Sequence, residues 1–165
     1  MRLKGYAYQD PFYEFIGLSS MNHSPTSKLN NRECSLPIRV YIEDTDAGGI
    51  VYYVNYLKYM ERSRTELLRS MGFGKAAVLD DDLLLVVRHA DIDYLAAARL
   101  DDEIIATAQV QKVAKTYVVF YQEVRRSDQL LCKAVVKIAC VQTLNNKMKP
   151  AQIPAPVYQS LLKML

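Results

Sequence analysis

The chain has 165 residues, of which 50% are hydrophobic and 24% are charged, and this ordinary globular balance excludes wholesale disorder. Its formal net charge of +3 is too small for the dense basic stripe of a nucleic-acid-binding protein. The longest apolar run, Leu83 to Val87, is far shorter than the roughly 20 residues of a membrane-spanning helix, so no membrane span is expected. The length suits one domain with its own core.

The cysteine and histidine content argues against a metal site. Cys34, Cys132 and Cys140 form neither a CxxC pair nor a metal-ligand spacing, and His23 and His89 are the only histidines. Cys132 and Cys140 fall in one predicted strand, roughly 26 Å apart, which is too far for a disulfide. We therefore expect reduced thiols, no metal and a cytoplasmic protein.

Residues 1–34 differ in composition from the rest of the chain. Residues 1–16 are rich in aromatic side chains, and residues 19–35 are rich in Ser, Asn and Pro. The start is basic, but acidic and polar residues interrupt any apolar core of a signal peptide. We expect a poorly ordered, non-secretory extension over residues 1–34 and one domain over residues 35–165.

A strand, a loop and a long helix are predicted after the extension. Ile38, Val40 and Ile42 alternate with polar neighbours, which is typical of a half-buried strand. A glycine-containing polar loop over residues 44–49 follows. Apolar residues at three- and four-residue steps then predict a helix from about Tyr52 to Met71, which is about 30 Å long and can cross a whole sheet.

The remainder reads as four strands, over residues 83–94, 104–110, 116–126 and 130–143, with a turn at residues 127–129. A proline-containing tail leads to a short terminal helix. This order contains no repeated βαβ unit. It predicts the α+β class, with an antiparallel sheet and one long helix packed on it.

The start of the long helix is the most unusual feature of the sequence. No Ser, Thr, Asp or Asn stands just before it, so its first N–H groups stay free to bind an anion or a polarised carbonyl oxygen. Asp46, six residues upstream of Tyr52, is close enough to be held beside this helix end. A carboxylate and a carbonyl-polarising helix end make a minimal acyl-transfer site. On spacing alone, a glycine turn with Asp44 and Asp46 merely solvated remains an alternative.

A family resemblance strengthens the acyl-transfer interpretation. Residues 44–56, D-T-D-A-G-G-I-V-Y-Y-V-N-Y, closely resemble the signature of the hot-dog-fold 4-hydroxybenzoyl-CoA thioesterase family. Residues 59–66, Y-M-E-R-S-R-T-E, are similar to its tol-pal-associated (YbgC-like) acyl-CoA thioesterase branch. Further similarity occurs at residues 86–88, 98–102 and 147–150, so the resemblance covers about residues 37–150.

The resemblance implies a hot-dog fold, in which a curved antiparallel sheet wraps around one long central helix and the chains pair into dimers or tetramers. It assigns the catalytic carboxylate to Asp46, as nucleophile or as general base toward water. It also assigns the backbone N–H that polarises the thioester carbonyl to Tyr53. We interpret Asp44 as a residue that structures the loop.

The same resemblance suggests how coenzyme A is bound. Lys115 and Thr116 match a basic-hydroxyl pair that contacts the nucleotide in relatives, and exposed cations elsewhere could assist. The expected substrate-binding residues are Gly49, Val54, Asn55, Arg88, Lys115 and Thr116, with Lys149 as a further cation. No metal and no organic cofactor are implied, because coenzyme A is part of the substrate.

The chain departs from the tol-pal branch at one position. That branch usually has His where this chain has Tyr53, whereas the 4-hydroxybenzoyl-CoA branch has Tyr. A mechanism that gives this histidine a proton-transfer role does not apply here. The choice between aliphatic and aromatic acyl groups therefore stays open.

The sequence predicts an acyl-CoA thioesterase that produces a free acid and CoA. A hot-dog hydratase or dehydratase is an alternative, but that chemistry uses a His, and neither His23 nor His89 lies in the motif. A non-catalytic scaffold that binds acyl-CoA or acyl carrier protein is another alternative. The expected partners are the acyl-CoA substrate, further copies of the chain and, as a candidate, acyl carrier protein.

Overall fold

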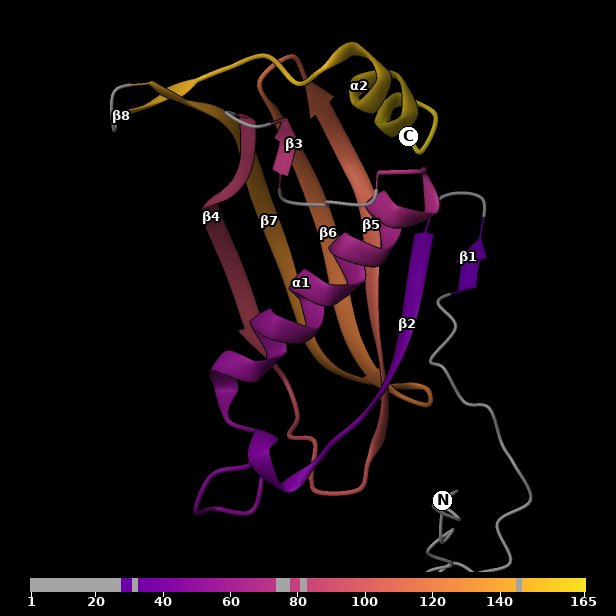
Figure 1. The fold of residues 1–165 in the computed structure, drawn as a ribbon. Coiled ribbons are helices and arrows are strands. Elements are labelled where there is room, and N and C mark those ends of the chain that lie inside the picture. The colour runs from indigo at the N-terminus through magenta and orange to yellow at the C-terminus, as the bar shows by residue number, and fades with distance from the viewer. Residues whose placement is uncertain (1–27, 31–32, 74–77, 81–82, 145–146) are drawn as a thin grey trace, which may run out of the picture.

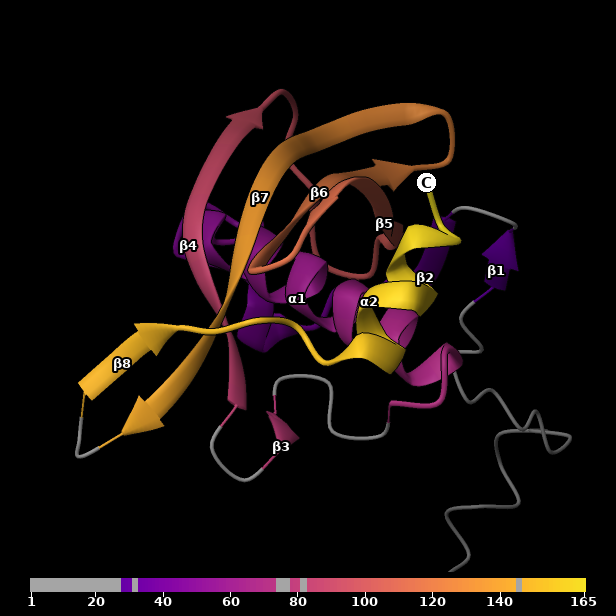
Figure 2. The same cartoon turned by 90° about the horizontal axis from the view of Figure 1, so that it is seen from above.

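The computed structural model describes residues 28–30, 33–73, 78–80, 83–144 and 147–165, which form one curved antiparallel sheet around a long helix (Figures 1 and 2). The strand order is β1-β2-β5-β6-β7-β4-β3, and β8 pairs with β7. The strands are β1 (Lys28–Asn30), β2 (Glu33–Arg39), β3 (Val78–Asp80), β4 (Leu83–Tyr94), β5 (Glu103–Ala114), β6 (Tyr117–Arg126), β7 (Gln129–Leu144) and β8 (Lys147–Pro150). The helices are a 3₁₀ helix η1 (Ile42–Asp44), α1 (Tyr53–Ser70) and α2 (Ala155–Leu162). The predicted hot-dog architecture is confirmed.

The helix α1 forms the centre of the core because one of its faces is buried along its whole length. Tyr59, Met60 and Leu67 are each 0% exposed and pack against the concave side of the sheet, chiefly against β2, β5 and β6. Burying side chains of this size contributes about 1.5–3 kcal/mol each. The helix ends at Ser70, two residues before Gly72, whose φ of +90° suits glycine at a helix end.

The central strands supply the other half of the core, and the alternation of buried residues is most regular in β6. In β6, the residues Val118, Phe120 and Val124 face the helix, and Phe120 lies opposite Val136 of β7. Cys132 in β7 is 0% exposed, and burial raises the pKa of its thiol to about 12. A thiol with such a pKa stays protonated and unreactive at neutral pH.

The strand predicted across Ile42 ends earlier than its alternation suggests. The structure ends β2 at Arg39 and folds residues 42–44 into η1, which leaves Ile42 71% exposed. The Asp44 carboxylate accepts the Tyr41 N–H at 2.9 Å, and the Thr45 hydroxyl donates to the Ile42 carbonyl at 2.9 Å. These local bonds compete successfully with strand pairing.

The sheet also begins earlier in the sequence than the expected domain start at residue 35. The strand β1 pairs antiparallel with β2, with Lys28 opposite Ser35, and β2 itself begins at Glu33. Residues 1–27, most of the expected extension, lie outside the described residues. The short strands β1, β3 and β8 did not follow from the sequence pattern.

The strand β4 has an outer edge that is largely unpaired. One edge of β4 pairs with β7 along its whole length. On the outer edge, β3 pairs only with Leu83 and Leu84, and no described strand pairs with the outer edge from Leu85 to Tyr94. Large side chains along and beside this edge are exposed, among them Val87 at 57% and Leu95 at 55%. Within the described residues, no helix is long and apolar enough to cross a membrane.

Candidate active site

The loop that carries Asp46 is a tight turn held by the Asp46 backbone and side chain. The Asp46 carboxylate accepts the Gly48 N–H at 2.8 Å, and the Asp46 carbonyl accepts the Gly49 N–H at 2.9 Å. Gly49 has a φ of +71°, and a Cβ on Gly48 would lie 3.0 Å from the Asp46 carboxylate. The positive φ favours glycine at position 49, whereas Gly48 leaves room for the Asp46 carboxylate. Asp46 itself is exposed, with one carboxylate oxygen anchored.

Hydrogen bonds to Asp44 tie this loop to the first turn of α1. The Asp44 carbonyl accepts the Tyr52 N–H at 2.9 Å and the Asn55 side-chain amide at 2.8 Å. Asn55 is only 4% exposed, so its side chain serves the protein backbone. Burial of the Tyr59 hydroxyl raises the pKa of Tyr59, and the charge of the nearby Asp44 carboxylate raises this pKa further. Asp44 thus lies at the centre of the structural contacts of the loop.

The N-terminus of α1 is uncapped, as the sequence indicated. The residue before it, Tyr52, makes no side-chain capping bond. Among the described residues, no acceptor binds the N–H groups of Tyr53 and Val54, whereas the Asn55 N–H donates to the Tyr52 carbonyl at 2.8 Å. Two free donors at the positive end of a helix of 18 residues form a ready site for an oxyanion.

Several tyrosine rings cluster at the start of α1. The rings of Tyr53 and Tyr94 pack edge to face with centroids 6.1 Å apart, and the Tyr94 hydroxyl donates to the Tyr53 carbonyl at 3.1 Å. A hydrogen bond with Tyr53 raises the pKa of Tyr52, and the charge of the nearby Asp46 carboxylate raises it further. Tyr94 was not identified from the sequence, because only the sheet register places the end of β4 beside the start of α1.

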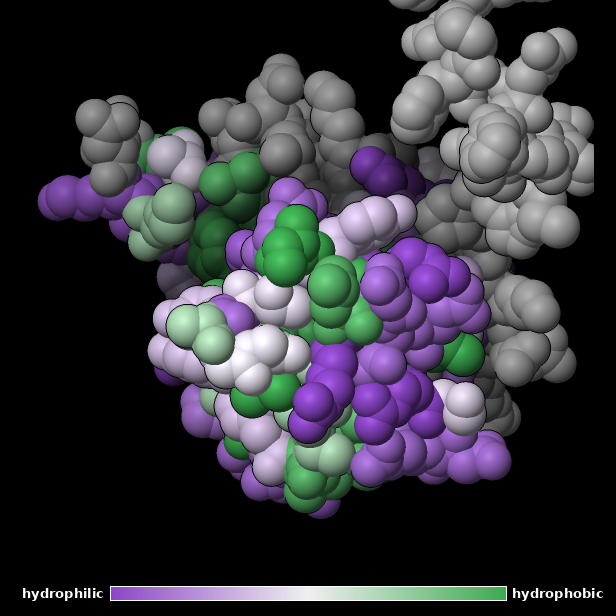
Figure 3. All heavy atoms as spheres, turned by 90° about the horizontal axis from the view of Figure 1, so that it is seen from below, coloured by the Kyte–Doolittle hydropathy of each residue, from purple (hydrophilic) through white to green (hydrophobic). Residues whose placement is uncertain are grey.

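The molecular end around this loop has a mixed surface, seen end-on in Figure 3. Hydrophobic residues there form small separate areas among hydrophilic ones. The exposed Ile42, at 71%, belongs to η1, and Leu95 and Leu100 belong to the β4–β5 connection. The site is therefore open to solvent in the single chain.

The predicted nucleotide-binding residues lie far from Asp46 within one chain. Lys115 and Thr116 form the β5–β6 turn, and the strand register places their neighbour Tyr117 level with Val86 of β4. Eight residues of β4 separate Val86 from Tyr94 at the helix start, which corresponds to about 26 Å. One chain alone does not bring these residues beside Asp46.

Two other predicted residues lie along β4. Arg88 is an exposed residue at an irregularity of the β4–β7 pairing, between Val87 and His89. His89 is exposed too, and the five residues from His89 to Tyr94 span about 16 Å. The structure therefore places no described histidine beside Asp46. The residues that do surround the loop and the helix start are Asp44, Asp46, Gly49, Tyr53, Val54 and Asn55.

Known proteins are similar to this chain in sequence. The sequence model of the thioesterase superfamily matches residues 48–133. The acyl-CoA thioesterase YbgC of Haemophilus influenzae is 44% identical over 124 residues, which cover 74% of this chain and 90% of that protein. The acyl-CoA thioester hydrolase YbgC of Escherichia coli O157:H7 is 40% identical over 122 residues, with 73% and 90% covered.

Solved structures share the fold. A probable thioesterase from Bartonella henselae is 31% identical, with a TM-score of 0.65 and with 75% of this chain and 100% of that chain covered. A 1,4-dihydroxy-2-naphthoyl-CoA thioesterase from Synechocystis is 22% identical, with a TM-score of 0.67 and with 79% and 96% covered, and this similarity concerns the fold alone. The chain therefore belongs to the thioesterase superfamily of hot-dog enzymes.

Proposed function

We propose that this protein is an acyl-CoA thioesterase that hydrolyses an acyl-CoA to the free acid and CoA. The observation that supports it best is the anchored Asp46 carboxylate on a loop tied to the uncapped start of α1. The similarity to acyl-CoA thioesterases of Haemophilus and Escherichia supports the same substrate class.

In this proposal the thioester oxygen binds the Tyr53 N–H, and the positive end of α1 stabilises the oxyanion that develops there. Asp46 acts on the carbonyl carbon from the other side. As a general base it takes a proton from water, which attacks the carbon. As a nucleophile it forms an anhydride that water then opens. In both routes the C–S bond breaks, its electron pair goes to sulfur, and the CoA thiolate takes up a proton.

We also propose that the active form contains at least two copies of the chain. The free edge of β4 from Leu85 to Tyr94, with Val87 and Leu95 exposed beside it, is a surface that a second copy can cover. Antiparallel pairing of β4 with its copy is self-complementary, as a two-fold interface requires. It brings the β5–β6 turn of one copy toward the Asp46 end of the other.

This assembly gives Lys115 and Thr116 a role that they do not have in one chain. Both residues would reach coenzyme A bound at the Asp46 loop of the other copy, and the exposed Lys115 ammonium would pair with its phosphates. Gly49, Val54 and Asn55 would shape the acyl end, Asn55 indirectly through Asp44. Arg88, on the free strand itself, would lie close to the contact between copies.

A thiol-release assay across a panel of acyl-CoAs of different length and aromaticity tests the proposed activity. Release of CoA by the wild-type chain, lost in Asp46→Asn, is the expected result. The same acyl groups carried on acyl carrier protein form a second arm of the assay. Binding of acyl-CoA without any thiol release would favour a scaffold over an enzyme.

A further inference from the structure

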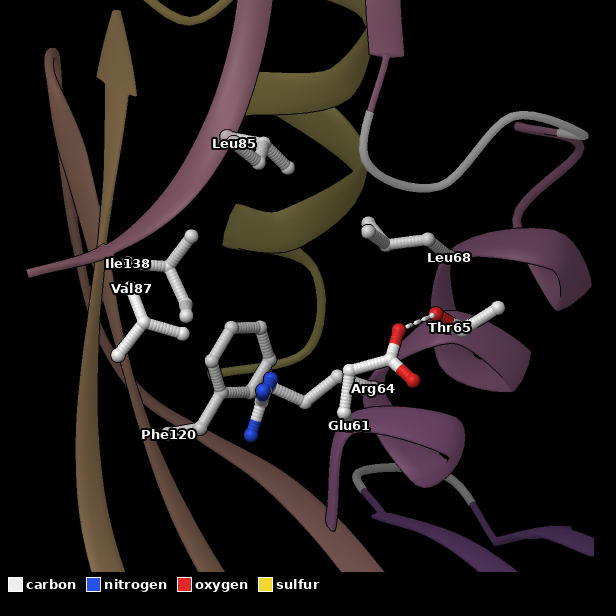
Figure 4. Close-up of a pocket in the computed structure, with 8 residues that line it drawn as sticks. All are labelled: Glu61, Arg64, Thr65, Leu68, Leu85, Val87, Phe120 and Ile138. Atoms are coloured by element: carbon white, nitrogen blue, oxygen red, sulfur yellow. Dashed lines mark hydrogen bonds between the residues drawn. The ribbon is translucent and has the colours of Figure 1, made fainter. Parts of the chain in front are cut away.

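A cavity of about 100 Å³ lies between α1 and β4, about two to four helical turns beyond the helix start (Figure 4). Most of its wall is apolar, and the rest comes from one side of α1. The lining residues are Leu68, Leu85, Val87, Phe120 and Ile138, together with Glu61, Arg64 and Thr65 of α1. This cavity lies outside the Asp46 loop, and the proposed mechanism does not use it.

The guanidinium of Arg64 is buried at this cavity and is held in place by a fixed amide. Arg64 is 8% exposed, and its Nη1 donates to the Gln122 side-chain oxygen at 2.5 Å. Gln122 is 0% exposed, and its amide nitrogen donates to the carbonyls of Met60 and Thr107, each at 2.9 Å. These two bonds orient the Gln122 amide with its oxygen toward Arg64. The Arg64 guanidinium therefore contacts a neutral acceptor, the Gln122 side-chain oxygen.

The positive charge of Arg64 lacks a counterion in the described part of the chain. No described carboxylate forms an ion pair with it, and the Glu61 carboxylate accepts a hydrogen bond from the Thr65 hydroxyl at 2.7 Å. Burial lowers the pKa of Arg64 to about 10, although the charge of Glu61 acts in the opposite direction. The guanidinium is still charged at neutral pH. A buried, unpaired charge is costly, and an anion that binds beside it removes much of that cost.

Arg64 lies on the same side of α1 as the start of the proposed active site. Eleven positions separate Tyr53 from Arg64, which is about three helical turns, and helical side chains lean back toward the N-terminus. Gln122 bridges Arg64 to the Met60 carbonyl, so the guanidinium lies near the level of Met60. From Tyr53 to Met60 the helix rises about 10 Å. A short acyl group that starts at the Tyr53 N–H spans such a distance.

We propose that this cavity receives the far end of an acyl group that carries a carboxylate, so that the preferred substrates are ω-carboxyacyl-CoA thioesters. The apolar wall packs against the methylene chain, and Arg64 binds the terminal carboxylate through charge-assisted hydrogen bonds. This inference rests on the proposed thioesterase function and names its substrate class.

The matched pair adipyl-CoA and hexanoyl-CoA tests the proposal, because both acyl groups contain six carbons and only one ends in a carboxylate. The wild-type enzyme is expected to have at least a tenfold higher kcat/KM for adipyl-CoA. In Arg64→Met, which keeps the length of the side chain without its charge, this ratio is expected to fall at least tenfold. Arg69→Met removes an exposed arginine from the same helix and is the control that keeps the ratio.

Substitution of Glu61 supplies a test of opposite sign. Among the described residues, Glu61 supplies the only carboxylate that lines the cavity, so Glu61→Gln should raise the ratio of kcat/KM for adipyl-CoA over hexanoyl-CoA. A general loss of stability would not raise this ratio. Opposite changes of this kcat/KM ratio in Arg64→Met and Glu61→Gln would therefore support a cavity that selects acyl groups by their terminal charge.

A binding measurement on the wild-type chain tests the proposal without any variant, so it does not depend on whether the variants fold. Adipate should raise the melting temperature of the wild-type protein more than hexanoate at the same concentration. Equal hydrolysis of both thioesters, with equal effects of the two acids, would overturn the proposal and leave the thioesterase function standing. Absence of CoA release from every thioester would overturn the thioesterase function itself.

Discussion

The side-chain amide of Asn55 donates a hydrogen bond to the backbone carbonyl of Asp44 at 2.8 Å, across the start of α1. Since Asn55 belongs to the first turn of the helix and Asp44 precedes Asp46 by two residues, this bond fixes the carboxylate relative to the free helix donors. The Tyr52 N–H donates to the same carbonyl at 2.9 Å. Two hydrogen bonds to one carbonyl therefore join the loop to the helix end.

The first prediction concerns the proposed catalytic carboxylate. Asp46→Asn keeps an oxygen that can accept the Gly48 N–H but removes the base or nucleophile. We expect hydrolysis to fall by about 10²–10⁴-fold, with an unchanged melting temperature. Thiol release under saturating acyl-CoA measures the loss, and light scattering checks that assembly survives. Near-normal turnover in this variant would remove Asp46 from the mechanism.

Asp44 is expected to behave differently from Asp46. Its carboxylate accepts the Tyr41 N–H at 2.9 Å at the N-terminal cap of η1, so Asp44→Ala removes a capping bond. We expect a loss of about 0.5–2 kcal/mol in the free energy of unfolding, measured by denaturant titration, with a smaller effect on kcat than Asp46→Asn. A stable Asp44→Ala variant without turnover would instead give Asp44 a direct part in the reaction.

Much of this architecture could be predicted from the sequence, because long elements have strong periodic patterns. The apolar spacing of α1 and the alternation of β6 and β7 are local signals, and the structure places these elements within a few residues of the expected positions. The short strands β1, β3 and β8 have too few residues for such a pattern. At Ile42 the capping bond of Asp44 overrides an alternation that favoured a strand.

Relationships across the sheet could not be read from the sequence. Arg64 and Gln122 are 58 residues apart and meet only because β6 passes beneath α1. The placement of Tyr94 beside Tyr53 likewise depends on the register of β4. The same strand register places Lys115, which matches a family position, at the opposite end of the sheet from Asp46.

The two glycines of the loop give a matched pair of substitutions. A methyl group on Gly49 has open space but forces the alanine into a φ of +71°, so Gly49→Ala should cost about 1–2 kcal/mol of stability. A methyl group on Gly48 would press on the Asp46 carboxylate at 3.0 Å, so Gly48→Ala should lower kcat more than stability. Thermal unfolding and turnover, measured on both variants, separate the effects. The reverse pattern would contradict the placement of Asp46 in the turn.

Lys115 tests the role of the distant turn. Lys115→Ala should raise KM for acyl-CoA severalfold with little change in kcat, because the nucleotide lies far from the reacting carbon. The difference between wild type and variant should shrink as salt rises, since the Debye length is about 8 Å at physiological ionic strength. Lys163→Ala, on the exposed end of α2, is a matched control. An unchanged KM at low salt would exclude Lys115 from nucleotide binding.

The last prediction separates the backbone of Tyr53 from its side chain. Tyr53 is the first residue of α1, and Tyr52 before it is extended with a ψ of 129°, so proline fits this position sterically. The Tyr53 N–H binds no described acceptor, so Tyr53→Pro breaks no backbone hydrogen bond of the described fold. It deletes the proposed oxyanion donor, and we expect turnover to fall by about 10²–10³-fold. Circular dichroism and thermal unfolding check that the variant keeps its fold.

Two further variants at the same position complete the argument. Tyr53→Ala removes the ring that packs against Tyr94 but keeps the N–H, so it measures the contribution of the ring alone. Tyr53→Phe removes only the hydroxyl and should leave kcat nearly unchanged. If Tyr53→Pro and Tyr53→Ala had equal turnover, the oxyanion donor would be another group, and Val54, with the second free N–H, would be the next to test by Val54→Pro. An inactive Tyr53→Phe would show that the phenol transfers a proton during the reaction.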